Sequence, residues 1–315
     1  MAAVDLSALP AKLGTYALSN YKEILTGILQ DDLSFLKYFG NVIPTNDELP
    51  LAQLTMNTLL QPGGKDAFNA KQAGEFKARI GKVRACKADV SWAPSVIKAM
   101  WQSYLGQIDG GKIDPATIPF EAFLIAKVIA KVKQELHYLA VYKGVLNAGG
   151  TAPADTMNGL VKLIATAALP AGNIAAAPGT ITAANAGDKL KLVLECVDDT
   201  YYDLPMVCIV SPKVARFYNA WYQTTYGSLP YNTEYKKTFL EGTMIEIVSE
   251  PGLSGTNHII ITPKENLFWL VDDSANMERV IVEKEKRNIH VMMDFNASPE
   301  IGMGEIVWTN IQAAV

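Results

Sequence analysis

The stretch TLLQPGGKDAFNAKQAGEFKARIGKVRACKADVSW, Thr58–Trp92, decides the fold of this chain. Its first part is polar and rich in glycine, with few side chains that a core could bury. From Glu75 onward apolar and charged residues alternate, which is typical of a β-strand with two unlike faces. We therefore expect a long two-stranded ribbon. Such a ribbon is marginally stable in water unless another surface covers it.

The ribbon is predicted to span residues 51–92. Its outgoing arm alternates weakly from Leu51, and the Pro-Gly-Gly run at 62–64 supplies turn residues. The return arm, residues 75–92, would reach about 60 Å if it were straight. Its alternation changes phase after Gly81, where we expect a bulge or a bend.

The segment 119–144 carries the strongest helical pattern in the chain. Apolar residues recur at helical spacing from Phe120 to Leu139, and lysines occupy much of the remaining surface. Pro119 suits the first turn of a helix, and Gly144 suits its end. At 1.5 Å per residue the helix would be about 36 Å long. That is long for a globular protein, in which the average helix has about 11 residues.

The flanking regions predict a mixture of helices and strands. An amphipathic helix is expected between Tyr21 and Phe39, in a segment that Pro44 ends. Beyond residue 153 helices alternate with strands, which indicates a mixed α/β unit. A helix capped by Ser211 should follow the first of these strands. The predicted strands are 204–210, 243–249, 257–262, 267–271 and 279–284, with a closing hairpin of 288–295 and 304–309.

The composition excludes some classes of function. The chain has 315 residues, of which 49% are hydrophobic and 19% charged, and its formal net charge is −4. This length allows one large domain or two moderate ones with a buried core. The chain lacks the surplus of Lys and Arg on which general nucleic-acid binding depends. A low charged fraction fits a surface that other copies of the chain cover, and it fits an ordinary enzyme almost as well.

Cysteine usage and the N-terminal sequence indicate a soluble, intracellular protein. Cys86, Cys196 and Cys208 lack CxxC spacing and are expected to be buried free thiols. The first residues, MAAVDLSALPAKLG, lack the features of a signal peptide. No run of about 18 apolar residues predicts a membrane span.

Two short motifs resemble catalytic signatures. GQIDGGKI at 106–113 has the outline of a phosphate loop, but Ile113 stands where Ser or Thr is needed and a helical pattern precedes it. Ser254 lies four residues before His258, but the G-x-S-x-G turn of a nucleophile elbow is missing. We interpret the first as a Gly-rich turn and the second as a loop serine near a strand histidine. A hydrolase that uses Ser254 stays an alternative, which Ser254→Ala would test.

The histidines and acidic pairs do not predict a metal site. His137, His258 and His290 are scattered, and none has a Cys or a carboxylate at ligand spacing. His137 is expected among the exposed positions of the long helix. Three pairs of adjacent acids are interpreted as solvated turn residues or helix ends: Asp31–Asp32, Asp198–Asp199 and Asp272–Asp273.

Two groups of residues leave alternatives to a purely structural role. The basic residues of the return arm are Lys77, Arg79, Lys82, Arg84 and Lys87. They allow a β-ribbon that lies in a DNA groove, although the aromatic platforms that bind single strands are missing. The aromatic residues at 217–226 fall at helical spacing, which favours a core stripe over a ligand platform. No pattern gives positive evidence for catalysis, and no cofactor is expected.

The order of the predicted segments resembles a known family. An N-terminal arm, a long hairpin, a very long helix, an α/β unit and a terminal β-hairpin follow one another. This order is similar to that of tailed-bacteriophage major capsid proteins, whose fold is shared with encapsulins and the floor domain of herpesvirus shells. Three phrases carry the likeness: IVSPKVARFYNAWYQ (209–223), IIITPKENLFWLVDD (259–273) and RNIHVMMDFNASPEIGMGEIVW (287–308).

The resemblance implies an α+β fold with the family's named parts. These are the N-terminal arm (1–50), the extended β-hairpin called the E-loop (51–92), the P domain (93–144) with its spine helix (119–144), the mixed α/β A domain (145–275) and the closing strands of the P domain (276–315).

The resemblance also implies a structural protein and not an enzyme. Subunits would assemble into the hexamers and pentamers of an icosahedral bacteriophage head that encloses double-stranded DNA. E-loops would cross to neighbouring subunits, where their basic side would meet carboxylates. The residues expected at these contacts are Lys65, Phe76, Lys77, Arg79, Ile80, Lys82 and Arg84.

The partners implied are other copies of the chain, portal and scaffold proteins, and packaged DNA, with no membrane. The protein would be part of the virion capsid, assembled in the host bacterial cytoplasm as a procapsid that then matures. Many relatives carry a cleaved N-terminal scaffolding segment. The chain has no room for one, so scaffold would be separate or this would be a trimmed form.

Two further questions concern relatives of the same fold. Some relatives join an E-loop lysine to a P-domain asparagine. Lys65, Lys71 and Asn296 lie in the corresponding segments, but no local motif fixes the match and cross-linking is not predicted. The nearest alternative function is an encapsulin-like compartment, whose shell holds a cargo protein instead of a genome.

Overall fold

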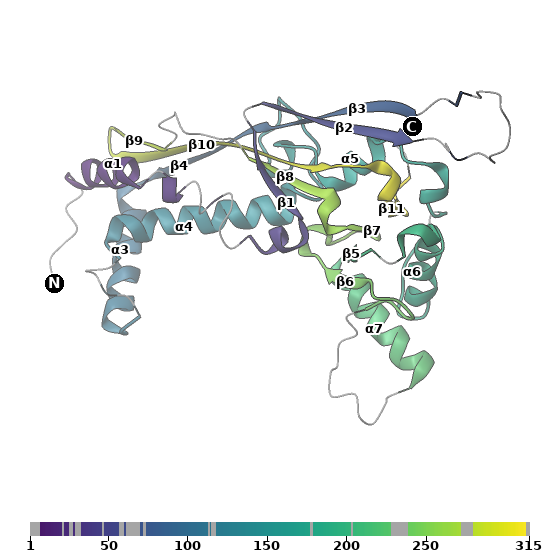
Figure 1. Cartoon of the computed structure of the whole chain (residues 1–315). Helices are drawn as coiled ribbons and strands as arrows, with labels where there is room; N and C mark the ends of the chain where they lie inside the picture. Colours follow the sequence, from purple (N-terminus) through teal and green to yellow (C-terminus); the bar gives the residue numbers. More distant parts are fainter. Residues whose placement is uncertain are drawn as a thin grey trace.

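The computed structural model describes most of the chain (Figure 1). The described residues are 7–20, 22–24, 28, 33–45, 47–56, 60, 70–71, 74–112, 114, 118–176, 179–202, 204–227, 239–271 and 280–312. The α-helices are α1 (Leu9–Ser19), α3 (Pro94–Asp109), α4 (Phe120–Glu135), α5 (Leu160–Thr166), α6 (Ala186–Leu194) and α7 (Pro212–Tyr226). The strands are β1 (Asn41–Pro44), β2 (Glu48–Met56), β3 (Gly74–Lys82), β4 (Arg84–Trp92), β5 (Met206–Val210), β6 (Glu246–Ser249), β7 (Ile259–Pro263), β8 (Leu267–Val271), β9 (Val280–Glu285), β10 (Asn288–Ile301) and β11 (Trp308–Thr309).

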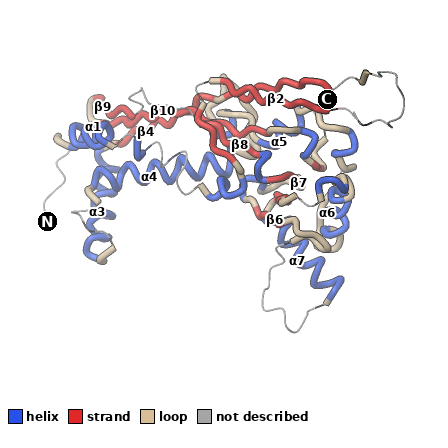
Figure 2. The backbone as a smooth tube through the Cα atoms, viewed as in Figure 1, coloured by secondary structure: helices blue, strands red, loops and turns tan. Residues whose placement is uncertain are grey.

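The strand β10 organises the first sheet. One part of β10 pairs antiparallel with both β4 and β9, and the part that follows pairs with β8, which in turn pairs parallel with β1. The sheet order is therefore β1-β8-β10-β4, with β9 joined to β10. Buried and less buried residues alternate along the first part of β10, whereas its last five residues are all buried. Helix α4 runs alongside this sheet (Figures 1 and 2).

The second sheet is the centre of a separate α/β unit. Its order is β11-β7-β5-β6, and every residue of β5 and β7 is buried. A fully buried strand reads as a continuous apolar run, which is why VCIV and IIIT are recognisable in the sequence. Helices α6 and α7 pack against this sheet, and their apolar faces share one core with it. Ser211 caps α7 as predicted, because its hydroxyl accepts a hydrogen bond from the Val214 amide at 3.4 Å.

The hairpin of β2 and β3 lies outside both sheets. The two strands pair antiparallel from Glu48 opposite Lys82 to Met56 opposite Gly74. The predicted ribbon is therefore real, but its return arm is not one strand. The ladder ends at Lys82, and from Arg84 the chain enters the first sheet as β4, where it pairs with β10.

Gly81 is not the bulge that the sequence predicted. It pairs in register with Leu49, and the break comes at Val83. The alternation of the sequence changes phase because the second half of the arm faces a different sheet. A side chain at Gly81 would meet the Cγ atom of Glu300 at 3.0 Å and the Cδ1 atom of Leu270 at 3.1 Å. The absence of a side chain at Gly81 thus allows the hairpin to approach the first sheet closely.

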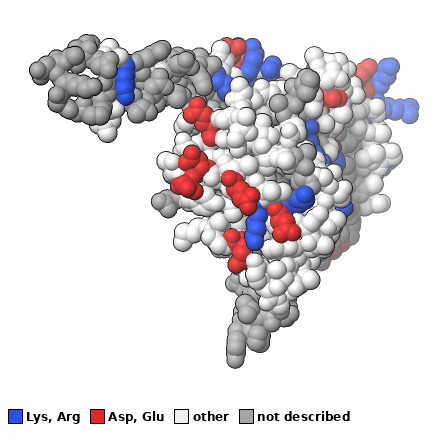
Figure 3. Space-filling view, turned by 90° about the vertical axis from the view of Figure 1, so that its right-hand side faces the viewer, with Lys and Arg blue, Asp and Glu red and all other residues white. Residues whose placement is uncertain are grey.

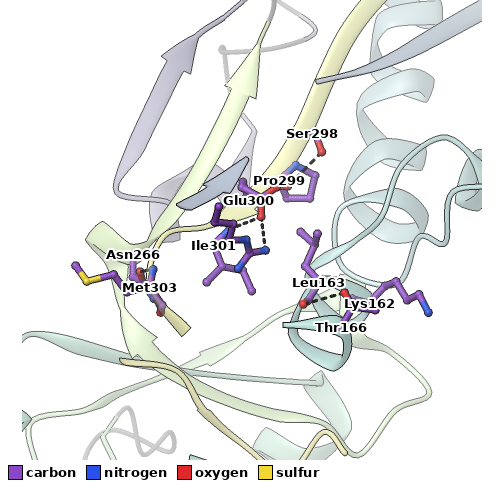
Figure 4. A network of polar contacts seen from close by, with 10 residues as sticks. Lys162, Leu163, Thr166, Asn266, Ser298, Pro299, Glu300, Ile301 and Met303 are labelled. Carbon is purple, nitrogen blue, oxygen red and sulfur yellow. Dashed lines mark hydrogen bonds and ion pairs between the residues drawn. The ribbon is translucent and has the colours of Figure 1, made fainter. Parts of the chain in front are cut away.

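The predicted closing hairpin of 288–295 and 304–309 is wrong. β10 continues through Ile301, and β11 pairs with β7 in the second sheet. Figure 4 shows how Asn266 fixes the turn between them. Its side-chain amide donates to the Met303 carbonyl at 2.9 Å, and its side-chain oxygen accepts from the Met303 amide at 2.7 Å. This clamp turns the chain out of the first sheet.

Part of the N-terminal segment packs on the body of the protein. Helix α1, which the sequence analysis missed, packs on β9 and α4 and buries Leu9 and Leu13. The amphipathic stripe predicted between Tyr21 and Phe39 lies partly outside the described residues, and its last part is a 3-10 turn, Ser34–Tyr38, in place of an α-helix.

The long helix is confirmed with one change. α4 passes directly into a π-helical turn, Leu136–Ala140, in which the Val141 amide bonds to the Leu136 carbonyl at 3.0 Å. The prediction that His137 lies on the exposed part of this helix is wrong. Its side chain is only 12% exposed, because residues of two other segments cover it.

The close approach of Gly40 to the segment before β8 gives a stability prediction. A Cβ at Gly40 would lie 2.5 Å from the Glu265 Cα and 2.6 Å from the Lys264 carbonyl oxygen. Both are backbone atoms, so they cannot rotate away. We expect Gly40→Ala to lower the free energy of unfolding by about 1–3 kcal/mol in chemical denaturation. Gly14→Ala is the matched control, since no atom lies within 4 Å of its added Cβ; it should raise stability by about 0.5–1 kcal/mol. Equal effects of the two substitutions would contradict the packing at Gly40.

Candidate subunit interface

A buried ion pair joins the base of the hairpin to the first sheet. The Arg79 guanidinium on β3 donates to the Glu300 carboxylate on β10 at 2.5 Å. The Glu300 side chain is 6% exposed and that of Arg79 is 29% exposed. The same Glu300 oxygen also accepts from the Ile301 amide at 3.1 Å, which fixes the carboxylate on its strand (Figure 4).

Burial governs the ionisation of Glu300. Loss of water around the carboxylate raises its pKa, and Arg79 and Arg84 offset part of that rise. The protonated form is therefore more favoured in the folded protein than in the unfolded chain. This carboxylate adds stability at low pH, and the contribution is lost as the pH rises through its raised pKa. The ion pair consequently fixes the direction of the hairpin more than it stabilises the fold.

The other basic residues near the hairpin also have partners in their own chain. Lys82 donates to Glu48 across the hairpin at 2.8 Å, and both side chains are more than 40% exposed. Lys87 pairs with Asp89 on β4 at 3.0 Å. Exposed pairs of this kind contribute little to stability. Arg79, Lys82 and Lys87 therefore each have an acidic partner in the same chain. The expected contact of this side with carboxylates of a neighbour stays a prediction.

Of the predicted contact residues, the described ones gather at the hairpin base. Arg79, Ile80, Lys82 and Arg84 occupy the last residues of β3 and the first of β4. Ile80 is 59% exposed, although the neighbouring Arg79 forms an ion pair with the buried Glu300. Lys65 and the side chains of Phe76 and Lys77 lie outside the described residues.

Acidic side chains gather on the side of the molecule that carries α6 (Figure 3). Asp188, Glu195, Asp198 and Asp199 are all exposed there. The Thr200 hydroxyl, together with the Thr200 amide that donates to Asp198 at 2.8 Å, lowers the pKa of the Asp198 carboxyl group. The pair at 198–199 is therefore a solvated turn, as predicted. This side does not suit DNA, because phosphates would be repelled.

The catalytic outlines do not form sites. Gly106 lies inside α3, so the phosphate-loop outline is not preceded by a strand. Within the described part of the chain, no hydrogen bond joins Ser254 to His258, and no group of three His, Cys, Asp or Glu side chains could hold a metal. Among the same residues, no helix has the length and apolar content that a membrane span requires.

The buried groups are mostly those that the sequence indicated. Cys86 and Cys208 are buried free thiols, and burial raises the pKa of each, to about 11 and about 12 respectively. Cys196 is only half-buried. Tyr218 and Trp221 belong to the second core, as expected for an aromatic core stripe.

Sequence reasoning missed the acidic partners Glu300 and Glu250. Glu300 lies in the buried run that ends β10. Glu250 directly follows β6, its side chain is 2% exposed, and it pairs with His137. The available signal was a lone acid within or beside an apolar strand, since such an acid needs a partner when buried. Nothing in the sequence names that partner.

No protein-family model matches the sequence, and no curated protein matches it. Solved structures do match its fold over nearly the whole chain. A chain of the satellite phage P4 procapsid, in a structure including the size determination (Sid) protein, is 12% identical, with a TM-score of 0.63 over 94% of this chain and 91% of that one.

Two other capsid structures give the same result. A chain from the capsid of a native GTA particle is 11% identical, with a TM-score of 0.58 over 91% of this chain and 92% of that one. A chain from the cyanophage A-1(L) capsid is 11% identical, with a TM-score of 0.54 over 90% and 95%. The chain therefore has the α+β fold of tailed-phage major capsid proteins.

The Arg79–Glu300 pair predicts a pH-dependent effect of mutation. Arg79→Ala should lower the free energy of unfolding by about 1–3 kcal/mol near pH 7.5, because it leaves a buried carboxylate without its cation. The loss should shrink toward pH 4.5, where Glu300 takes up a proton. Denaturation of the variant and the parent at both pH values measures this. Lys82→Ala, which breaks the exposed pair, should cost less than about 1 kcal/mol at either pH. A pH-independent loss in Arg79→Ala would rule out an uncompensated charge as its cause.

Proposed function

We propose that this chain is a major capsid protein that self-assembles into the hexamers and pentamers of an icosahedral bacteriophage head around double-stranded DNA. The observation that carries the proposal is the hairpin. Among the described strands, β2 and β3 pair only with each other. The base of the hairpin contacts the first sheet through the Arg79–Glu300 ion pair. A two-stranded ribbon with both outer edges open is stabilised when another surface pairs with it or covers it.

The proposed covering surface is a second copy of the chain. The comparisons support this choice. The similar structures are capsids, and the alignment spans nearly the whole length of this chain and of the capsid chains. A contact in which one patch meets a different patch of the next copy closes into a ring when its rotation closes. Rings of five and six such copies build a shell.

The mechanism proposed is physical and involves no reaction. Each contact is modest, so that a misplaced subunit leaves, and many simultaneous contacts make the closed shell persistent. The hairpin is the E-loop of this proposal, with its base at Arg79 and Ile80. Portal and scaffold proteins are proposed partners, with assembly in the host bacterial cytoplasm. An encapsulin-like shell around a protein cargo is the alternative within the same fold.

Electron microscopy of the expressed protein tests the proposal. We expect closed shells, or rings of five and six subunits. Nucleic acid inside shells formed with portal and scaffold would support the phage head, whereas a co-purified protein cargo would favour the alternative. A protein that stays monomeric at high concentration in every condition would refute a shell function.

Shortening the hairpin should separate folding from assembly. Met56 and Gly74 are paired opposite each other, so residues 57–73 can be replaced by an Asn-Gly turn without changing the register of β2 and β3. The shortened protein should keep its cooperative unfolding and circular dichroism, but it should not form shells. Shells of normal size from this variant would contradict the role given to the hairpin.

The exposed Ile80 gives a point mutation with the same logic. Since its side chain is 59% exposed, Ile80→Asp should change stability by less than about 0.5 kcal/mol. If a second copy covers the hairpin base, the buried charge should reduce the yield of shells at least tenfold, as counted by sedimentation. Ile80→Val keeps the apolar surface and should assemble like the parent. Equal yields from all three proteins would place Ile80 outside the interface.

A further inference from the structure

Three separate segments of the chain meet at His137. Its Nε2 atom bonds to the Glu250 carboxylate, which comes from the end of β6 in the second sheet. Its Nδ1 atom lies 3.3 Å from the Ser34 hydroxyl of the N-terminal segment. His137 itself belongs to the π-helical turn at the end of the long helix. One imidazole therefore links the N-terminal segment, the long helix and the second sheet.

The Glu250 carboxylate depends on this histidine for its charge balance. Its side chain is 2% exposed, and His137 is its ion-pair partner within the described part of the chain. Glu250 also accepts from the Gly252 amide at 3.3 Å and so shapes the turn that follows β6. A buried carboxylate that loses its cation is strongly destabilising to the arrangement that buries it.

The backbone at this junction is closely packed. A Cβ at Gly252 would lie 2.3 Å from the Tyr142 ring and 2.8 Å from the His137 carbonyl oxygen. Tyr142 is fully buried, and its pKa is raised well above the usual value by burial and by Glu250. The turn after β6 therefore lies directly against the end of the long helix.

The π-helical turn at Leu136–Ala140 is a local departure from the winding of the long helix. The hydrogen bond from the Val141 amide to the Leu136 carbonyl spans five residues, whereas the bond from the Gly144 amide to the Ala140 carbonyl spans four. Returning the turn to α-helical winding would move the residues after it by one position, a rotation of about 100°. Single π turns inside helices are often found at functional positions for this reason.

Protons can reach His137 from solvent. Its ring borders a surface depression of about 220 Å³ between the long helix and the 3-10 turn of the N-terminal segment. The Tyr138 ring stacks on it with centroids 5.0 Å apart, and the Phe35 ring lies 5.5 Å away. The other titratable groups that face the junction come from three places. They are Lys133 beside the depression, Tyr38 of the N-terminal segment, Tyr138, Tyr142 and Lys143 at and after the helix end, and Glu246 and Lys264 of the second sheet.

We propose that the Ser34–His137–Glu250 junction is a pH-dependent joint that sets the angle of the second sheet relative to the long helix. Histidine changes charge between about pH 5 and 8. Protonated His137 neutralises Glu250 and holds the second sheet against the helix end. Neutral His137 leaves the buried carboxylate uncompensated, so the π turn and the turn after β6 loosen together. The inference rests on the proposed function only for its consequence, which is a pH-dependent shape of the assembling subunit.

Hydrogen exchange of the unassembled full-length protein tests the joint directly. After correction for the intrinsic effect of pH, we expect exchange in peptides covering residues 136–142 and 250–254 to be at least threefold faster at pH 8 than at pH 6. In His137→Gln, which keeps a hydrogen-bonding group but carries no charge, the two pH values should give the same corrected rates. His290→Gln is the matched control, because His290 lies 3.6 Å from Glu285 in an exposed pair; it should behave like the parent.

A second variant covers the case in which His137→Gln does not fold. Glu250→Gln removes the buried charge and keeps an acceptor for the Gly252 amide, so it should also abolish the pH response. The proposal is overturned if the parent shows no pH response in these two segments, or if both His137→Gln and Glu250→Gln keep it.

Assembly provides the separate test of the consequence. Shells formed by the parent at pH 6 and pH 8 should differ in size distribution, and those formed by His137→Gln should not. A pH response in exchange without shells at any pH would support the joint and refute the shell function. A pH response in neither exchange nor shell size would overturn the joint and leave the shell function standing.

Discussion

The pairing of Arg79 with Glu300 is the contact on which the placement of the hairpin depends. Because β3 has no sheet partner besides β2 among the described strands, its direction is inherited from β10 through this pair and through the close approach of Gly81. Glu300 stands in a fully buried run, so only a nearby cation allows it to stay ionised. Strand β10, which pairs with β4, β8 and β9, thus also determines the direction of the hairpin.

The parts of the fold that the sequence predicted are those decided by local pattern. The buried strands β5 and β7, the cap at Ser211 and the long helix all follow from apolar runs or helical spacing. Strand partners are decided elsewhere in the chain. The return arm of the ribbon reads as one alternating segment, yet it serves two sheets, because β10 supplies a partner for β4 and none for β3.

The candidate site was predicted only in part for the same reason. The basic residues of β3 were visible in the sequence, and the structure places them at the hairpin base. Their acidic partners were not visible, because Glu300 lies 221 positions from Arg79 in the chain. The turn after β10 was also misassigned, since Asn266, which clamps Met303, lies before β8 and gives no local sign of that role.

Both junctions that hold separate segments together use a buried carboxylate and one cation. Glu300 meets an arginine, which keeps its charge at every physiological pH, whereas Glu250 meets a histidine, which does not. Well-packed apolar residues of similar size would often be as stabilising as such pairs. Pairs of this kind specify geometry, because each buried charge is compensated only in the arrangement that places its partner beside it. In the proposed shell, a hairpin that contacts a second copy needs a defined direction more than it needs added stability. The permanent charge of Arg79 therefore suits a contact that fixes the orientation of the hairpin. The titratable His137 suits the proposed joint, in which the angle of the second sheet changes with pH.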